Sequence, residues 1–272
     1  MNRRHLMASL LAAYAAAATR ATKANALATS PAASHSHSDH SKYHEIKHET
    51  IVLVAYPMMT ALDLLGPQHM LASMMGAKVL IAAQTPEPIT SDTGLKIVPD
   101  VDFTHCPREI DLFLVPGGLA GTTAAMKDPR TIAFVRELAA HSKYITSVWT
   151  GSLILGTAGL LKGYKATSHW IASHMLPYFG ATPVAQRVVV DRNRITGAGV
   201  TAGMDLALTV VNMLRGEDYT RMVTLLAEYD PAPPIHAGSP DTAGPQTTGI
   251  LRDMFSDWLA DTEAFAKGNG HG

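Results

Sequence analysis

The stretch ITSVWTGSLILGTAGLL, residues 145–161, combines a strand and a helix around one sharp turn. Its first part is rich in β-branched residues, as expected of a buried strand, and its second part opens on Thr-Gly-Ser and continues as an apolar helix. In α/β proteins, a residue at such a turn projects its side chain beyond the carboxyl end of the strand. That residue is Trp149, which has no nucleophilic atom. The stretch therefore predicts an α/β fold with an unusual residue at its turn.

Outward from this stretch, strand and helix patterns alternate. Apolar, β-branched runs predict further strands at residues 49–56, 77–83 and 110–118, the last ending in a glycine pair. Helical patterns occupy residues 66–76, 128–142 and 201–216, the first with Pro67 expected in its first turn. A small hairpin is expected at residues 89–100, and two short strands at 186–199. This alternation predicts a doubly wound, mostly parallel sheet sandwiched by helices.

The amino-terminal residues do not belong to this pattern. Arg3 and Arg4 precede a short apolar run, and Ala26-Leu27-Ala28 has the small-x-small form of a signal-peptidase site. The run is shorter than the about 20 residues that span a bilayer. Residues 1–28 are therefore expected to be a signal peptide of the twin-arginine type, which would make the protein periplasmic or secreted with no membrane segment after cleavage. The alternative is a disordered, alanine-rich leader.

Residues 29–48 form a polar, histidine-rich segment, which we interpret as a disordered linker. His35, His37 and His40 are weak candidates for loose binding of copper or zinc. No fixed spacing defines a coordination geometry, so a solvated tail is the preferred interpretation.

The predicted globular domain spans residues 49–229. Residues 230–249 are proline-rich and expected to be extended. Residues 250–266 carry an apolar stripe at helical spacing and predict an amphipathic helix packed on the domain. Packing of this helix across a dimer interface is the alternative.

The composition excludes some classes of function. The chain has 272 residues, 47% of them hydrophobic, and a formal net charge of −1, without the basic cluster that a nucleic-acid partner requires. Cys106 is the only cysteine, so no intrachain disulfide forms. The sequence has no phosphate-binding loop, paired cysteines or HExxH motif. We therefore expect no cofactor and no metal centre.

Three loops follow predicted parallel strands and are expected to meet at one edge of the sheet. They carry Asp63, the pair Gly117 and Gly118, and the pair Trp149 and Thr150. Asp63 is a candidate general base or hydrogen-bonding group. The backbone amides of the glycine pair, of Thr150 and of the next residue are candidates for binding substrate or stabilising negative charge. That next residue is Gly151.

Five stretches in chain order resemble the ThiJ/PfpI superfamily, which has a class I glutamine-amidotransferase-like (flavodoxin-like) fold, and within it the isonitrile hydratases. They are LDLLGP, VPGG, TSVWTGSLILGTAGLLKGYKATSHW, TGAGVTAGMDLAL and EYDPAPPIHAGSPDTA. The resemblance implies addition of water to an isonitrile to give an N-substituted formamide. It also implies a homodimer.

In that family a cysteine at the turn attacks the isonitrile carbon, while an aspartate and a threonine assist. The resemblance places the aspartate at Asp63, the threonine at Thr150 and the cysteine at Trp149, so the nucleophile is missing. Cys106 precedes a strand and is expected away from the pocket. His169 occupies the position where amidotransferase relatives keep a catalytic histidine; without a thiol to activate, we expect it to be a hydrogen-bonded core residue beside Trp170.

Two hypotheses follow. In the first, which we prefer, the protein binds a small molecule without catalysis, and Trp149 fills or lines the pocket. In the second, it is a hydro-lyase in which Asp63 activates water directly, while Gly118 and Thr150 hold the isonitrile.

Overall fold

The computed structural model describes residues 46–269. The signal peptide, most of the histidine-rich linker and the metal candidates His35, His37 and His40 lie outside the described residues. No helix among the described residues is long and apolar enough to cross a membrane.

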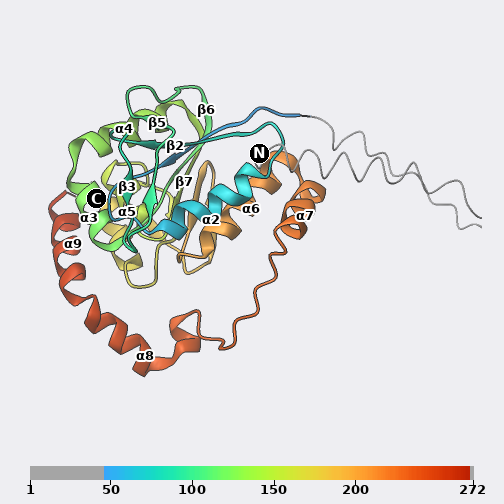
Figure 1. The fold of residues 1–272 in the computed structure, drawn as a ribbon. Coiled ribbons are helices and arrows are strands. Elements are labelled where there is room, and N and C mark those ends of the chain that lie inside the picture. The colour runs from blue at the N-terminus through green and yellow to red at the C-terminus, as the bar shows by residue number, and fades with distance from the viewer. Residues whose placement is uncertain (1–45, 270–272) are drawn as a thin grey trace, which may run out of the picture. The chain divides into compact units, whose positions relative to one another are not determined.

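The described chain forms the α/β sandwich that the sequence predicts (Figure 1). Its main sheet consists of β1 (Thr50–Val54), β2 (Lys78–Ala83), β5 (Val101–Asp102), β6 (Ile110–Val115), β7 (Ser142–Val148), β10 (Val188–Asp191) and β11 (Arg194–Gly197). Two small sheets pair β3 (Ile89–Thr90) with β4 (Lys96–Ile97), and β8 (Lys165–Ala166) with β9 (Thr182–Pro183).

The described residues also form helices, not all of which cover the main sheet. They are α2 (Ala61–Ala72), α3 (Leu119–Lys127), α4 (Pro129–His141), α5 (Gly151–Thr157), α6 (Ala202–Arg215), α7 (Glu217–Leu226), α8 (Pro240–Met254), α9 (Ser256–Asn269) and the 3-10 helix η2 (Ser173–Phe179). Helices α2 and α6 lie side by side on one face, and α3, α4 and α5 pack on the other (Figure 1).

The strand order is β10-β11-β7-β6-β1-β2-β5. All neighbouring strands are parallel except β10 and β11, which form the expected antiparallel pair. The three strands that precede the candidate site, β7, β6 and β1, are therefore neighbours. Their carboxyl ends lie at one edge of the sheet, where open α/β sheets bind ligands.

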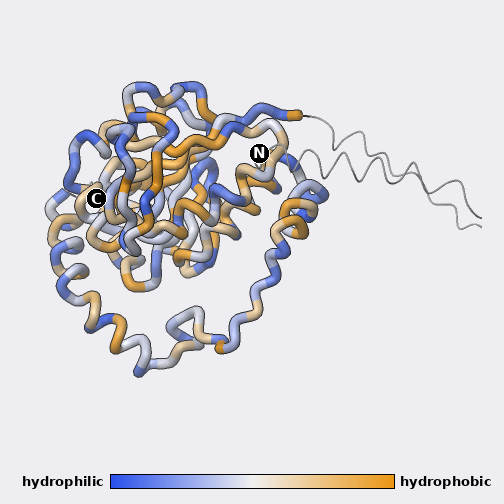
Figure 2. Tube along the Cα trace, in the orientation of Figure 1, coloured by the Kyte–Doolittle hydropathy of each residue, from blue (hydrophilic) through white to orange (hydrophobic). Residues whose placement is uncertain are grey.

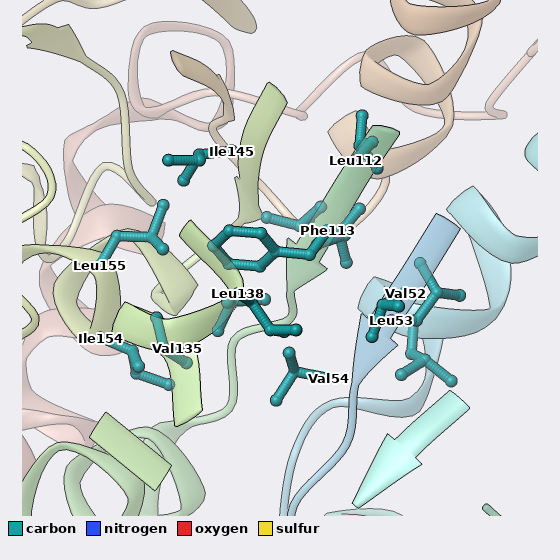
Figure 3. Packing of buried hydrophobic residues seen from close by; sticks show 14 of the residues in the cluster. Val52, Leu53, Val54, Leu112, Phe113, Val135, Leu138, Ile145, Ile154 and Leu155 are labelled. Carbon is teal, nitrogen blue, oxygen red and sulfur yellow. The ribbon is translucent and has the colours of Figure 1, made fainter. Parts of the chain in front are cut away.

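The core lies between the central strands and their covering helices. Hydrophobic residues concentrate in the strands and the inner helices (Figure 2). Phe113 of β6 and Ile145 of β7 are buried together with Leu138 of α4 and Leu155 of α5 (Figure 3). Because both faces of these strands are covered, they carry continuous apolar runs instead of alternating patterns.

Helix α2 begins earlier than the sequence indicates. It starts at Ala61, so Pro67 lies inside the helix and Asp63 lies in its first turn instead of in a loop. A proline there removes one backbone hydrogen bond. A Cβ on Gly203 of α6 would come within 2.9 Å of the Pro67 ring, which shows how closely the two helices approach. Packing against α6 thus outweighs the local preference for a helix start at Pro67.

The carboxyl-terminal region also differs from the prediction. Helix α8 occupies part of the segment expected to be extended, and a break at Phe255 separates it from α9. The Ser239 hydroxyl accepts from the Thr242 amide, and the Thr242 hydroxyl accepts from the Ser239 amide, which starts α8 with a capping box. Helix α9 docks on the domain, where Thr262 is hydrogen-bonded to Thr123.

Candidate active site

The loops after β1, β6 and β7 bring the predicted site residues together. Gly117 donates its backbone N–H to Asp63 Oδ2 at 2.8 Å, and Gly118 donates its N–H to Thr150 Oγ1 at 3.0 Å. Residues that follow three different strands, with Asp63 in the first turn of α2, are thus connected by hydrogen bonds. Both glycine amides therefore donate to side chains of the protein. Their expected contact with a ligand stays a prediction.

Trp149 occupies a strained turn. Its φ is 57°, a left-handed conformation that costs a residue with a Cβ about 1–2 kcal/mol. The turn is fixed by hydrogen bonds on both sides of the residue. The Trp149 N–H donates to Gly197 O at 3.0 Å, and its carbonyl accepts from the hydroxyls of Ser168 (3.0 Å) and Ser152 (3.2 Å). The protein therefore retains the geometry of a nucleophile-bearing turn although the side chain is an indole.

Two glycines allow this close packing. A Cβ on Gly117 would lie 2.6 Å from the Thr150 nitrogen and 2.9 Å from Asp63 Oδ2. A Cβ on Gly151 would lie 2.2 Å from the Val115 carbonyl oxygen. All three distances are shorter than real Cβ contacts, so Gly117 and Gly151 cannot be replaced without moving their neighbours.

Asp63 is a fully buried carboxyl group. Its side chain has no exposed surface, and Oδ1 has no hydrogen-bond partner. Burial raises the pKa of the Asp63 carboxyl well above its usual range, only partly offset by the Gly117 amide. A carboxyl group with a raised pKa is suited to act as a general acid, and the expected role of Asp63 as a general base stays a prediction.

Thr150 belongs to a chain of buried hydroxyls. Its Oγ1 lies 2.8 Å from Thr122 Oγ1, and Thr122 Oγ1 lies 3.4 Å from the Tyr56 hydroxyl. The Tyr56 hydroxyl donates its proton to Pro116 O at 2.6 Å. Burial raises the pKa of Tyr56, so this proton is retained. Thr122 Oγ1 lies closer to Thr150 Oγ1 than to the Tyr56 hydroxyl. The shorter distance favours a hydrogen bond between the two threonine hydroxyls.

The indole of Trp149 packs edge-on against the imidazole of His169. The ring centroids lie 5.6 Å apart and the planes are inclined by 85°. Trp149 Nε1 and His169 Nδ1 are both buried without a hydrogen-bond partner. Burial lowers the pKa of His169 to about 4, so the ring is neutral at neutral pH. His169 adjoins Trp170 as expected, but its Nδ1 does not have the hydrogen bond expected of a core histidine.

A cavity of about 770 Å³ begins at His169. Its walls include Trp170, Arg187, Val200 and His236. The cavity therefore lies between residues that follow β8 and the segment 236–242, which leads into α8. A second cavity, of about 870 Å³, is open and lies between α6 and α7. Asp63 and Thr150 are fully buried, and neither residue lines either of these two cavities.

Sequence reasoning missed Arg187 and His236 as cavity residues. The stretch EYDPAPPIHAGSPDTA, residues 228–243, contains His236, but only the fold brings this stretch to the same cavity as His169. The position of His169 near the turn was expected only from the resemblance to the amidotransferase relatives.

Cys106 lies away from the candidate site, as the sequence predicts. It lies before β6 and therefore near the amino ends of the strands, away from Asp63. The residue is buried, and burial raises the pKa of its thiol to about 11. Within residues 46–269, no group of three or more His, Cys, Asp or Glu side chains is arranged to hold a metal ion.

Residues 49–213 match the DJ-1/PfpI family. The chain is 48% identical over 193 residues to isonitrile hydratase from Pseudomonas putida, covering 71% of this chain and 84% of that protein. The crystal structure of a ThiJ/PfpI family protein from Pseudomonas syringae is similar with a TM-score of 0.82 and 46% identity, covering 90% of this chain and 98% of that one. Drosophila melanogaster DJ-1beta shares the fold at a TM-score of 0.60 and 21% identity, over 67% of this chain and 98% of its own.

Proposed function

The chain belongs to the DJ-1/PfpI family, and we propose that it binds a small neutral organic molecule without the covalent thiol chemistry of the isonitrile hydratases that it resembles. The observation that carries this proposal is Trp149. An indole, only 8% exposed, stands at the turn where the resemblance places the nucleophile. The indole packs against His169, and His169 lines the cavity of about 770 Å³.

The cavity suits a neutral ligand. Arg187 is a charged side chain in its wall, and its Nε donates to Asp205 Oδ2 at 2.6 Å. His169 is neutral because burial lowers its pKa to about 4. The remaining wall combines apolar residues, among them Trp170 and Val200, with uncharged hydroxyl side chains such as Ser173. Such a site favours an apolar body with a small polar head.

Calorimetric titration with cyclohexyl isocyanide and N-cyclohexylformamide tests this proposal. Saturable binding of at least one of them to the natural protein, with no turnover of the isonitrile, is the expected result. Val200→Trp, which fills the cavity, should abolish binding, whereas Leu225→Ala at an exposed position on α7 should not. Absence of binding by both compounds would refute the proposal.

A second candidate function is hydration of isonitriles by acid catalysis. The buried, neutral Asp63 with its unpartnered Oδ1 favours it. The Asp63 carboxyl would protonate the isonitrile carbon, giving a nitrilium ion and a carboxylate. The carboxylate would then take a proton from the water that attacks the same carbon. The resulting formimidic acid becomes the N-substituted formamide by moving a proton from oxygen to nitrogen.

Turnover of cyclohexyl isocyanide by the natural protein distinguishes this candidate. If Asp63 is the acid, Asp63→Asn should abolish formamide production and Cys106→Ser should leave it unchanged. Turnover that survives Asp63→Asn would exclude this route.

We further propose export through the twin-arginine route and assembly as a homodimer. Arg3, Arg4 and the site after Ala28 support export. Ile250 and Met254 are exposed apolar residues on α8, which supports association. Cell fractionation with an Arg3→Lys, Arg4→Lys variant and sedimentation analysis of the mature protein test the two proposals. Cytoplasmic wild-type protein or a monomer would contradict them.

A further inference from the structure

Two buried polar atoms lie on adjacent rings without a partner. Trp149 Nε1 carries a proton and only donates, while His169 Nδ1 belongs to a neutral ring. The two rings are in edge-on contact, yet the two nitrogen atoms do not bond to one another. A buried, unpaired polar atom in a native protein calls for an explanation, of which a bound molecule is one.

The indole N–H of Trp258, unlike that of Trp149, has hydrogen-bond partners. Trp258 Nε1 donates to Leu119 O at 2.8 Å and to Thr123 Oγ1 at 3.0 Å. Its N–H is thus satisfied inside the protein. The unpaired N–H of Trp149 is a local property of the site.

We propose that Trp149 and His169 together recognise the polar head of the ligand, and that this head is an amide-type group that both accepts and donates a hydrogen bond. The inference rests on the proposed binding function and names the chemistry of the ligand. The ligand carbonyl accepts from Trp149 Nε1, and its N–H donates to His169 Nδ1, with the imidazole proton on Nε2. The apolar body of the ligand occupies the cavity that His169 lines.

This pairing discriminates between compounds. An isonitrile has one acceptor, the terminal carbon, and no donor, so it satisfies one of the two protein atoms and leaves the other buried and unpaired. A formamide satisfies both. Leaving one buried group unpaired lowers affinity about tenfold or more. The residue at the turn therefore shifts the preference from the isonitrile to the amide.

The test compares three probes by calorimetry on the mature protein. N-cyclohexylformamide offers an acceptor and a donor, N-cyclohexyl-N-methylformamide offers only the acceptor, and cyclohexyl isocyanide offers a single acceptor. We expect the first to bind at least tenfold more tightly than the other two. His169→Phe should remove this preference, because it removes the acceptor for the ligand N–H.

Variants of two tryptophans complete the test. Trp149→Phe keeps an aromatic ring but removes the donor, so it should weaken N-cyclohexylformamide binding about tenfold. Trp258→Phe, the matched control, should leave binding unchanged. Equal affinity for all three probes, or equal effects of the two tryptophan substitutions, would overturn the inference while the binding function stands; water would then be the partner of the two nitrogens. If no probe binds, the proposed function itself fails.

Discussion

Trp149 Nε1 and His169 Nδ1 are buried, unpaired and carried by rings whose centroids lie 5.6 Å apart in an edge-on arrangement. This relationship joins the strained turn after β7 to the cavity wall. The indole occupies the turn position itself, and the imidazole opens onto the cavity. The proposed loss of thiol chemistry and the proposed ligand recognition therefore depend on the same pair.

The strain at Trp149 is measurable with two substitutions. Trp149→Ala should destabilise the protein by about 3–5 kcal/mol, because it removes a large buried side chain and leaves a Cβ at φ 57°. Trp149→Gly loses the same packing but relieves the strain. We expect the glycine variant to be more stable than the alanine variant by about 1 kcal/mol. Urea unfolding compares the two; the reverse order would mean that the turn relaxes once the indole is removed.

The neutral state of Asp63 predicts a pH dependence. In the unfolded chain this carboxyl has its usual pKa of 3.8, whereas burial raises the pKa in the folded protein. Folding therefore retains a proton that the unfolded chain releases, and this group's contribution to stability falls as pH rises from about 4 through the folded pKa. Asp63→Asn carries no charge and should gain stability relative to wild type, more at pH 8 than at pH 4.

Denaturant midpoints of both proteins across this pH range provide the measurement. Asp102→Asn serves as a control of opposite sign, because hydrogen bonds from Thr104 and His105 hold the pKa of Asp102 below its usual range. A difference between Asp63→Asn and wild type that does not change with pH would contradict a buried neutral carboxyl.

Ligand binding should follow the protonation of His169. Burial lowers the pKa of this imidazole from 6.5 to about 4, so the folded protein keeps it neutral where the unfolded chain takes up a proton. Its contribution to stability is complete above about pH 6.5 and is lost as pH falls toward 4. Affinity for N-cyclohexylformamide should be constant from pH 8 to about 5 and decline near pH 4. A loss of affinity already at pH 6.5 would show that His169 has the pKa of an exposed imidazole, and would contradict this prediction.

Thr122 is expected to position the Thr150 hydroxyl. Their hydroxyl oxygens lie 2.8 Å apart; if Thr122 is the donor, Thr150 Oγ1 accepts from both Thr122 and Gly118 and keeps its own proton for a substrate. In a Trp149→Cys background that turns over isonitrile, Thr122→Val should lower kcat about tenfold with little change in KM, and Thr122→Ser should restore it. An increase in kcat for Thr122→Val would show that Thr122 instead accepts the Thr150 proton.

The strand ends were predictable because the buried runs and the glycine pair set the order and direction of β1, β6 and β7. Their loops then had to meet, and Asp63, Gly117 and Thr150 do meet. The start of α2 was not predictable, since contact with α6 overrides the local signal of Pro67. Helix α8 was hidden because its capping box lies among prolines and glycines that favour extended chain.

The cavity was harder to foresee. It joins His169 to a segment near Pro240, and no local pattern reports that these parts of the chain face each other. The unpaired state of His169 Nδ1 also depends on its surroundings in three dimensions. Spacing identified the histidine, but burial and the loss of a partner decide what it does.

Formamide production from cyclohexyl isocyanide, measured side by side for the natural protein and its Trp149→Cys variant, tests the central claim most directly. We predict no product from the natural protein and measurable turnover from Trp149→Cys, which Asp63→Asn in the same background should reduce. Turnover by the natural protein that Asp63→Asn abolishes would contradict the account and establish a hydratase that works without a thiol.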